Sequence, residues 1–335
     1  MALHDDLIVI DGLVLPNWGR DGREHMRPDE SARTVFADMR RGGLTAANAS
    51  CSVWEGFDGT MRKIAQWKIW LREFSDLICL CRTAEDIRAA KRDGKVGIIL
   101  GWQNTSAVED QIPYLQLFQE LGVRIVQMTY NTQNLVGSGC YETTDSGLSD
   151  FGRELIDELN RLRMLIDLSH VGPKTSDDTI RYSKLPVCYS HVAPRAIKDH
   201  PRNRTDAQLR TIAEHGGFVG VNMFPPFTRH GSDSTLDDYV DAVEHVIALI
   251  GEDCVGVGTD FGWGNPYQPV YWTHDKGYAR NLVDFGAKRF PPDLQGYQDY
   301  PNITARMQAR GWPEDRIRKV MGANWLGFLE KVWGA

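Results

Sequence analysis

The sequence lacks basic runs, and it lacks any stretch of about 18 apolar residues, the length that indicates a membrane-spanning helix. Nucleic acids and anionic membranes are usually bound by basic clusters, so neither is expected as a partner. The formal net charge of -7 agrees with this expectation. Residues 1–6 include two acids and no apolar signal core, which predicts a cytoplasmic protein.

Cysteine is sparse and shows no ligand spacing. The six cysteines are scattered, and Cys79 and Cys81 are too close together for the CxxC spacing of a zinc ribbon or a redox motif. We therefore expect reduced thiols in apolar surroundings, as in the core of a cytosolic protein.

Internal repeats, low-complexity tracts and linkers are also missing. The chain has 335 residues, of which 42% are hydrophobic and 25% charged, so it has enough material for one large core. We predict a single domain over residues 1–335 that acts on a small molecule. A monomer and a homodimer both stay open.

Short apolar runs with strand character recur along the chain, separated by segments with helical spacing. They cover residues 7–10, 44–48, 96–100, 125–129, 164–168, 185–189, 218–222 and 255–259. Eight such strands alternating with helices are typical of an α/β protein with a single (β/α)8 TIM-type barrel. In that fold the functional groups lie on the loops that follow the strands.

Three segments depart from the plain alternation. Residues 57–87 predict a helical insertion after the second strand, and residues 303–333 predict closing helices. Residues 262–299 are rich in glycine, proline and aromatic residues and are too long for a passive connection, so we expect a lid loop over the barrel mouth. Elsewhere the helical marks are ordinary, for example the capping box predicted from Thr205 and Gln208.

Two neighbouring strands lead into a histidine. Residues 164–168 precede His170, and residues 185–189 precede His191. The polar segment between them fits a crossover helix, so the strands are expected to be parallel neighbours with their histidines at one edge. Each histidine alone reads equally well as a hydrogen-bonded residue at a strand end, but the repetition favours a pair of metal ligands.

The other strand ends complete a rim around the predicted mouth. They contribute Gln103 after the third strand, Tyr130 at the fourth and Asp260 at the eighth. Asp260 reads either as a turn-capping residue or as a carboxylate that faces the two histidines across the mouth. The second arrangement suits a metal that activates water while the acid moves the proton.

Several longer motifs occur in a fixed order along the chain. They are Ile10-Asp11-Gly12, Gly147-Leu148-Ser149, Glu158-Leu159-Asn160-Arg161-Leu162, Ile166-Asp167-Leu168-Ser169-His170, Ser190-His191, Arg202-Asn203, Gly258-Thr259-Asp260-Phe261 and Gly322-Ala323-Asn324-Trp325. In these motifs the chain resembles the membrane (renal) dipeptidase family, peptidase family M19 of the amidohydrolase superfamily. The resemblance implies a metal-dependent barrel hydrolase. By that resemblance His170 and His191 bind one metal, Arg202 holds a substrate carboxylate, and Asp260 is the acid at the eighth strand.

Four positions depart from the family pattern. The His-x-Asp pair that binds the other metal is replaced by Leu13 and Leu15, which cannot ligate. A bridging glutamate is replaced by Gln103, whose uncharged amide bridges two cations poorly, and a substrate-side histidine is replaced by Tyr130. We therefore expect at most one divalent metal, with zinc as the expected ion, on the two strand-end histidines and with Gln103 as a further ligand.

Aromatic residues follow several strand ends. Trp54, Trp102, Tyr130 and Trp263 are candidates for the wall of the substrate pocket, with Arg202 at its other end. The rings could form a cage around an alkylammonium group, or they could simply pack the lid. The cage would suit a small zwitterion, such as a dipeptide or an N-alkylated amino-acid derivative.

Three functions stay open from the sequence. The first is a dipeptidase-like, metal-dependent hydrolase of an amide or related bond in a small, carboxylate-bearing amino-acid derivative, with Asp260 moving the proton. The second is a barrel that binds a small zwitterion without hydrolysing it. The third is a metal-poor lyase or isomerase with Asp260 and Tyr130 as acid and base. The lost ligands favour the second, but retention of the two histidines, Arg202 and Asp260 speaks against it, so our prediction is hydrolysis.

Overall fold

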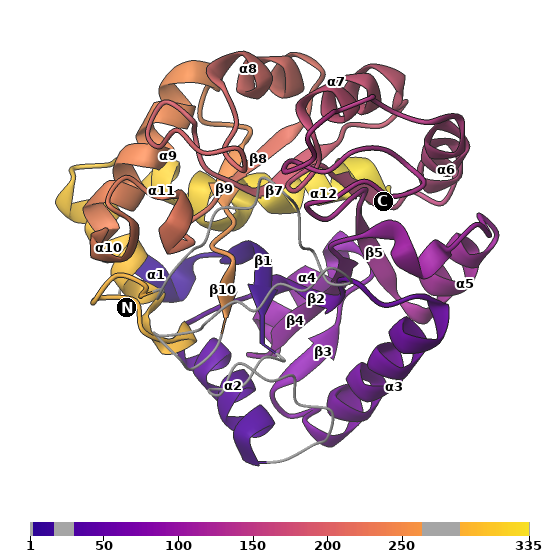
Figure 1. The fold of residues 1–335 in the computed structure, drawn as a ribbon. Coiled ribbons are helices and arrows are strands. Elements are labelled where there is room, and N and C mark those ends of the chain that lie inside the picture. Colours follow the sequence, from indigo (N-terminus) through magenta and orange to yellow (C-terminus); the bar gives the residue numbers. More distant parts are fainter. Residues whose placement is uncertain (1–2, 17–29, 263–288, 335) are drawn as a thin grey trace.

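A closed barrel of parallel strands forms the centre of the computed structural model, which describes residues 3–16, 30–262 and 289–334 (Figure 1). Its strands are β1 (Ile10–Leu15), β2 (Ala46–Ser52), β4 (Val96–Trp102), β5 (Val123–Gln127), β6 (Leu165–Asp167), β7 (Cys188–Val192), β8 (Phe218–Val221) and β9 (Val255–Val257). Each pairs in parallel with the next, and β9 pairs with β1 at Val257 and Asp11, which closes the barrel. The predicted (β/α)8 fold is confirmed.

Helices cover the outside of this barrel (Figure 1). They are α1 (Leu3–Asp6), α2 (Glu30–Arg41), α3 (Phe57–Glu73), α4 (Ala84–Arg92), α5 (Tyr114–Leu121), α6 (Asp150–Arg161), α7 (Pro173–Tyr182), α8 (Asp206–Glu214), α9 (Leu236–Ile250), α10 (Pro301–Ala309), α11 (Glu314–Arg318) and α12 (Asn324–Trp333). The predicted capping box at Thr205 and Gln208 is present at the start of α8. Within the described ranges, no helix is long and apolar enough to cross a membrane.

The strand order agrees with the sequence prediction, but some boundaries move. The first strand is predicted at residues 7–10 and instead runs from Ile10 to Leu15. Leu7 and Val9 are buried in the core, whereas pairing with the next strand begins only at Ile10. Burial of apolar side chains and strand pairing are separate requirements, so an apolar run alone misplaces this boundary.

The segments outside the plain alternation are more varied than predicted. Residues 57–87 contain α3, the short strand β3 (Ile78–Leu80), which pairs with β4, and the start of α4. A second short strand, β10 (Phe261–Gly262), pairs with β1. Most of the predicted lid, residues 263–288, lies outside the described residues. The sequence did not indicate β3 or β10.

The carboxyl-terminal segment closes one end of the barrel. The predicted closing helices are α10, α11 and α12, with a π-helical turn between the last two. Gly322 lies in that turn, and a Cβ atom there would collide with the Ile8 carbonyl oxygen, so only glycine allows this close approach. The Trp325 indole then packs against Phe218, with ring centroids 4.1 Å apart, and donates to the Val257 carbonyl oxygen at 2.8 Å. This plug fills the end of the barrel where the strands begin.

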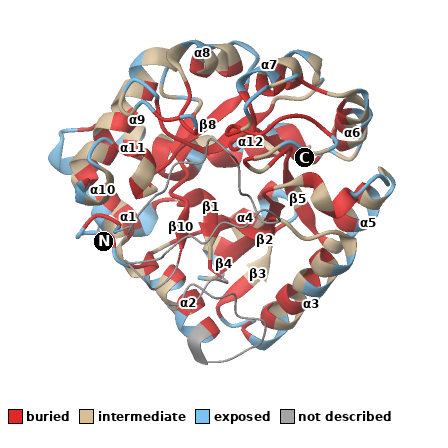
Figure 2. Cartoon of the chain, in the orientation of Figure 1, coloured by how far each residue is buried: buried red, intermediate tan, exposed pale blue. Residues whose placement is uncertain are grey.

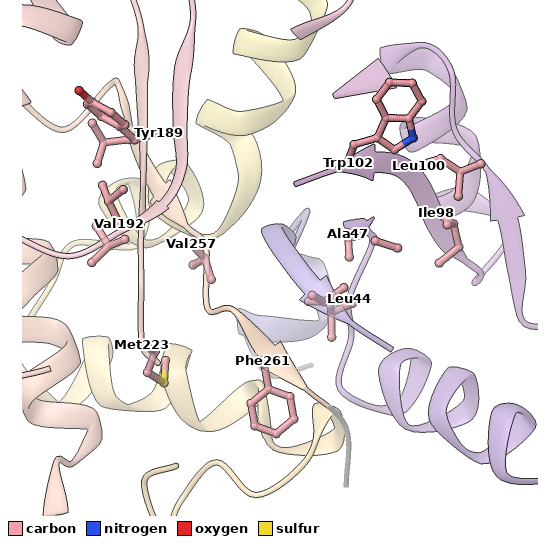
Figure 3. Close-up of a cluster of buried hydrophobic side chains, with 14 of the residues drawn as sticks. Leu44, Ala47, Ile98, Leu100, Trp102, Tyr189, Val192, Met223, Val257 and Phe261 are labelled. Carbon is pink, nitrogen blue, oxygen red and sulfur yellow. The ribbon is translucent and has the colours of Figure 1, made fainter. Parts of the chain in front are cut away.

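Besides the Trp325 plug, an apolar layer lies between the strands and the surrounding helices. Buried residues dominate the barrel and the inner faces of the helices (Figure 2). Figure 3 shows part of this layer, including Leu100, Trp102, Val192 and Val257. Trp325 fills the end of the barrel where the strands begin, and helices cover its outside. The functional site is therefore expected among the loops that follow the strands.

Candidate functional site

His170 lies just after β6 and is fixed through its ring. Its Nδ1 is 2.8 Å from the Asn131 Oδ1 atom. An amide oxygen only accepts, so Nδ1 carries the hydrogen and Nε2 keeps its lone pair. The ring stacks on the Tyr130 ring, with centroids 4.1 Å apart. The backbone carbonyl oxygen of His170 accepts a hydrogen bond from the Cys140 N–H at 2.9 Å. These contacts set both the orientation and the tautomer of the imidazole.

His191 lies within β7 and is backed by a buried carboxylate. The Ser190 hydroxyl donates to Asp167 Oδ2, so its oxygen accepts from His191 Nδ1 at 2.7 Å. Asp167 also accepts from the Ser169 and Ser190 backbone N–H groups, at 3.1 Å and 2.8 Å. His191 Nε2 is buried, and no group in the described residues forms a hydrogen bond with it. A buried nitrogen with a lone pair and no partner has the chemistry of a vacant ligand atom.

The two imidazoles lie next to each other. Their ring centroids are 5.2 Å apart, with the planes tilted by 54°. Burial lowers the pKa of both rings well below the usual value, and the Arg202 and Arg204 guanidinium groups lower both further. Neutral histidine is the form that binds metals, and the Nδ1 atoms of both rings are already engaged. The pair therefore fits a divalent metal bound through Nε2.

Asp260 follows β9 in a conformation that few residues adopt. Its φ is +59°, in the left-handed region that residues other than glycine rarely adopt. The residue is only 9% exposed. Its backbone N–H donates to the Leu13 carbonyl oxygen at 3.1 Å. The Asn222 amide lies 3.3 Å from Asp260 Oδ2 and 3.3 Å from the His191 carbonyl oxygen. Asn222 thus links the carboxylate to the strand that carries His191, and such held strain is typical of functional positions.

Arg202 is a fully buried cation beside this group. Its Nη2 donates to the His191 carbonyl oxygen at 2.9 Å, and its guanidinium lies 5.5 Å from the Phe227 ring centroid. In the described part of the chain, neither Nε nor Nη1 has a hydrogen-bond partner. A guanidinium with two donors available is suited to a carboxylate, which it can hold in bidentate fashion.

Tyr130 forms part of the wall next to His170. The Trp54 ring meets it edge-on, with centroids 5.4 Å apart. Burial raises the pKa of the Tyr130 phenol, and the negative charge of Asp260 raises it further. The hydroxyl therefore stays protonated at neutral pH, so it can donate a hydrogen bond.

The remaining candidates from the sequence are Gln103, Trp102 and Trp263. Gln103 is buried after β4 and donates through Nε2 to the Ser50 hydroxyl at 3.2 Å. Trp102 belongs to the apolar cluster of Figure 3 and is 1% exposed. It packs edge-on against Phe118, with centroids 4.6 Å apart. This corrects its expected place in the pocket wall, because its ring faces α5. Trp263 lies outside the described residues. Within the described ranges, no cluster of three or more His, Cys, Asp or Glu side chains could hold a metal ion.

The β1 side of the mouth carries Asp11, an acid that lies inside a noted motif but was given no role from the sequence. Leu13 is buried and Leu15 is half-buried. The Asp11 carboxylate accepts from the Leu13 N–H at 2.9 Å, from the Thr259 N–H at 3.0 Å, and from the hydroxyls of Thr259 and Tyr300 at 2.7 Å and 2.6 Å. Burial raises its pKa. Asp11 therefore joins β1 to the chain before Asp260 and has no oxygen left for a metal.

The residues that orient the histidines were also missed. They are Asn131, Asp167 and Ser190, of which the last two lie inside motifs already noted. The sequence did contain a signal for Ser190, because an imidazole that binds a metal through one nitrogen needs a hydrogen-bond acceptor for the other. Searching the residues next to each predicted ligand for such acceptors would have found Ser190.

Comparison with known proteins gives a consistent result. The family model described as membrane dipeptidase (peptidase family M19) matches residues 1–284. An uncharacterized dipeptidase of Schizosaccharomyces pombe is 30% identical over 325 residues, covering 90% of this chain and 73% of that protein. The dipeptidase tcpJ of Claviceps purpurea is 30% identical over 265 residues, covering 77% of this chain and 56% of that protein.

Solved structures give the same picture. The crystal structure of an amidohydrolase from Pseudomonas aeruginosa has a TM-score of 0.92 and 52% identity, covering 99% of this chain and 98% of that one. The structure of dipeptidase AC, a metallopeptidase of family M19, has a TM-score of 0.78 and 25% identity, covering 98% and 99%.

Proposed function

Because the chain belongs to the membrane dipeptidase family, peptidase family M19, and is a hydrolase, we propose that it cleaves an amide or related bond in a small amino-acid derivative that bears a carboxylate. The observation that carries this proposal is the pair of neutral, buried imidazoles with their Nδ1 atoms already engaged, next to Asp260 and Arg202. Together they offer a ligand pair, an acid and a carboxylate anchor.

The members of this family are metallopeptidases, and the residues present fit one divalent ion rather than two. His170 and His191 would hold the ion, and zinc is the ion we propose. Leu13 and Leu15 offer no ligand atom on the opposite side, and the Gln103 amide could add only a neutral oxygen. When bound, a divalent ion supplies Lewis-acid chemistry, in that it acidifies water and polarises a carbonyl group.

Asp260 is the proposed group for proton movement. It is the carboxylate that Asn222 holds against the strand of His191, so it lies at the same end of the barrel as the ligand pair. It would accept a proton from the attacking water and deliver it to the leaving nitrogen. The strained backbone at this residue supports a functional rather than a structural reason for its conformation.

Arg202 and Tyr130 are the proposed substrate-binding residues. The two available donors of Arg202 would hold the substrate carboxylate, which would also compensate a buried positive charge. Tyr130 would form a wall beside His170 and donate a hydrogen bond from its protonated hydroxyl. Trp263 stays a proposal from the sequence, and Trp102 is left out because it packs in the core.

Metal content and turnover test the proposal together. Protein purified without chelators should contain one equivalent of zinc and not two, and calorimetric titration with zinc, manganese or cobalt should show a single tight site. The purified enzyme should hydrolyse a member of a panel of dipeptides, N-acyl amino acids and N-methylated amino-acid derivatives. His170→Ala should remove metal and turnover together. Two tight ions, or tight binding of a panel member that stays intact with metal present, would contradict the proposal.

A further inference from the structure

Arg204 is a second buried arginine next to the site, and its contacts surround one of the histidines. Its Nη2 donates to three backbone carbonyl oxygens, those of Leu168 and Ser169 at 3.0 Å each and that of Val171 at 2.7 Å. These three residues are the two before His170 and the one after it. One guanidinium nitrogen therefore donates to backbone carbonyl oxygens on both sides of His170 in the turn that carries it.

The same residue is attached to the other histidine's strand. The Arg204 N–H donates to the Ala193 carbonyl oxygen at 3.0 Å, and the Arg204 carbonyl accepts from the Arg195 N–H at 2.7 Å. The guanidinium also lies over the Tyr189 ring, 5.0 Å from its centroid. Tyr189, within β7, precedes His191 by two residues, and Ala193, directly after β7, follows it by two, so Arg204 contacts the chain on both sides of His191.

Charge pairing does not explain why Arg204 is buried here. Its side chain is fully buried, and in the described part of the chain it forms no ion pair, and neither its Nε nor its Nη1 atom has a hydrogen-bond partner. An unpaired buried cation is unfavourable, and it is more so beside a site for another cation. Its described hydrogen-bond acceptors are the backbone carbonyls of the His170 turn. The arginine is therefore held by its hydrogen bonds to this turn and by the Tyr189 ring below its guanidinium.

We propose that Arg204 is a positioning residue, which locks the turn carrying His170 onto the end of β7 so that the two imidazoles keep their mutual orientation. A neutral side chain with a single donor cannot reproduce this arrangement, because three carbonyl oxygens converge on one guanidinium nitrogen. Arg204 touches neither ring, so its action on the site passes through the backbone.

The first test reads the histidine rings directly and needs neither metal nor substrate. Nitrogen-15 NMR of histidine-labelled protein reports the tautomer and environment of each imidazole. Arg204→Met should shift or broaden the His170 ring signals, assigned by their loss in His170→Ala, while the signals of His245, on α9, stay in place. Arg210→Met, the same change at an exposed site on α8, is the matched control and should leave the His170 signals unchanged.

A folded Arg204→Met protein with unchanged His170 signals would overturn the proposal. Arg204→Gln, which keeps one amide donor, replaces the methionine variant if that variant does not fold, and the same criterion applies to it. Circular dichroism and thermal unfolding establish that each variant is folded, since a purely structural role would lower the unfolding temperature without moving the ring signals of the folded protein.

The second test rests on the proposed function, because it assumes that His170 is a ligand. Zinc or cobalt should bind Arg204→Met about 10- to 100-fold more weakly than the wild type, which is the usual effect of losing a residue that orients a ligand. Equal affinity in a folded variant would overturn the proposal. If the wild type itself binds neither ion, the metal part of the proposed function fails, whereas the NMR result still decides the role of Arg204.

Discussion

Two buried aspartates on opposite sides of the barrel mouth show how one local structure serves two purposes. Asp11 lies on β1 and Asp167 on β6, and both accept a hydrogen bond from the backbone N–H two residues later. Burial raises the pKa of both carboxyl groups. Beyond this shared turn, Asp11 receives hydroxyls from Thr259 and Tyr300.

Asp167 instead receives hydroxyls that lead to the site. It accepts from Ser169 and Ser190, and Ser190 in turn accepts from the His191 ring. The β1 side therefore uses its acid to join strands, and the β6 side uses its acid to set the tautomer of His191, the proposed ligand. The comparison teaches that the same buried turn can support the fold or orient a site histidine, depending on where its hydrogen bonds lead.

Asp260 connects both sides, so its loss should have the largest effect. Asp260→Asn keeps the shape but cannot accept a proton, and we expect kcat on the best panel substrate to fall by about 10²- to 10⁴-fold. Metal content should stay at the wild-type level, which elemental analysis checks in the same preparation. A variant with near wild-type kcat would remove Asp260 from the mechanism.

Leu13→Ala tests whether the β1 side is purely structural. Leu13 is 1% exposed, so its truncation should lower the free energy of unfolding by about 2 to 5 kcal/mol, as measured by urea denaturation. The number of metal ions bound per folded chain should not change. A lower metal stoichiometry in folded protein would mean that this side contributes to the ligand set.

The sharpest comparison replaces one carboxylate oxygen by an amide NH₂ group in each of the two aspartates, through the Asp→Asn substitution. In Asp167→Asn the amide can donate to Ser190, which would then donate to His191 Nδ1 and place the hydrogen on Nε2. We expect metal affinity to fall by about 10- to 100-fold in calorimetric titration.

Asp11→Asn is the matched control. It should destabilise the fold by about 1 to 3 kcal/mol, because a donor replaces an acceptor of buried hydroxyls. Its metal affinity should equal that of the wild type. If both variants lose affinity alike, the distinction between the two sides is wrong.

Tyr300→Phe should have the smallest effect. It removes one of the donors to Asp11, and we expect a loss of about 1 kcal/mol in the free energy of unfolding. Turnover and metal binding should be unchanged, because the remaining donors from Thr259 still hold Asp11. A selective loss of activity with unchanged stability would place Tyr300 closer to the chemistry than its contacts indicate.

Much of the fold could be predicted from the sequence, since eight apolar runs with helical segments between them allow few closed arrangements. The strand order and the place of His170 and His191 at neighbouring strands followed from this pattern. Trp102 shows the limit. It directly precedes a rim residue, but successive side chains of a strand point to opposite faces, and a boundary uncertain by one residue exchanges pocket and core.

The sequence by itself determined which groups this protein can use: two histidines, an aspartate and an arginine after the strands, and leucines where other ligands would be needed. Only the tertiary structure decided how those groups are set. Asn131, Arg204 and Tyr300 act on partners that lie between about 30 and 290 residues away along the chain. A tautomer or a buried charge depends on its neighbours in space, and these are fixed only when the barrel closes.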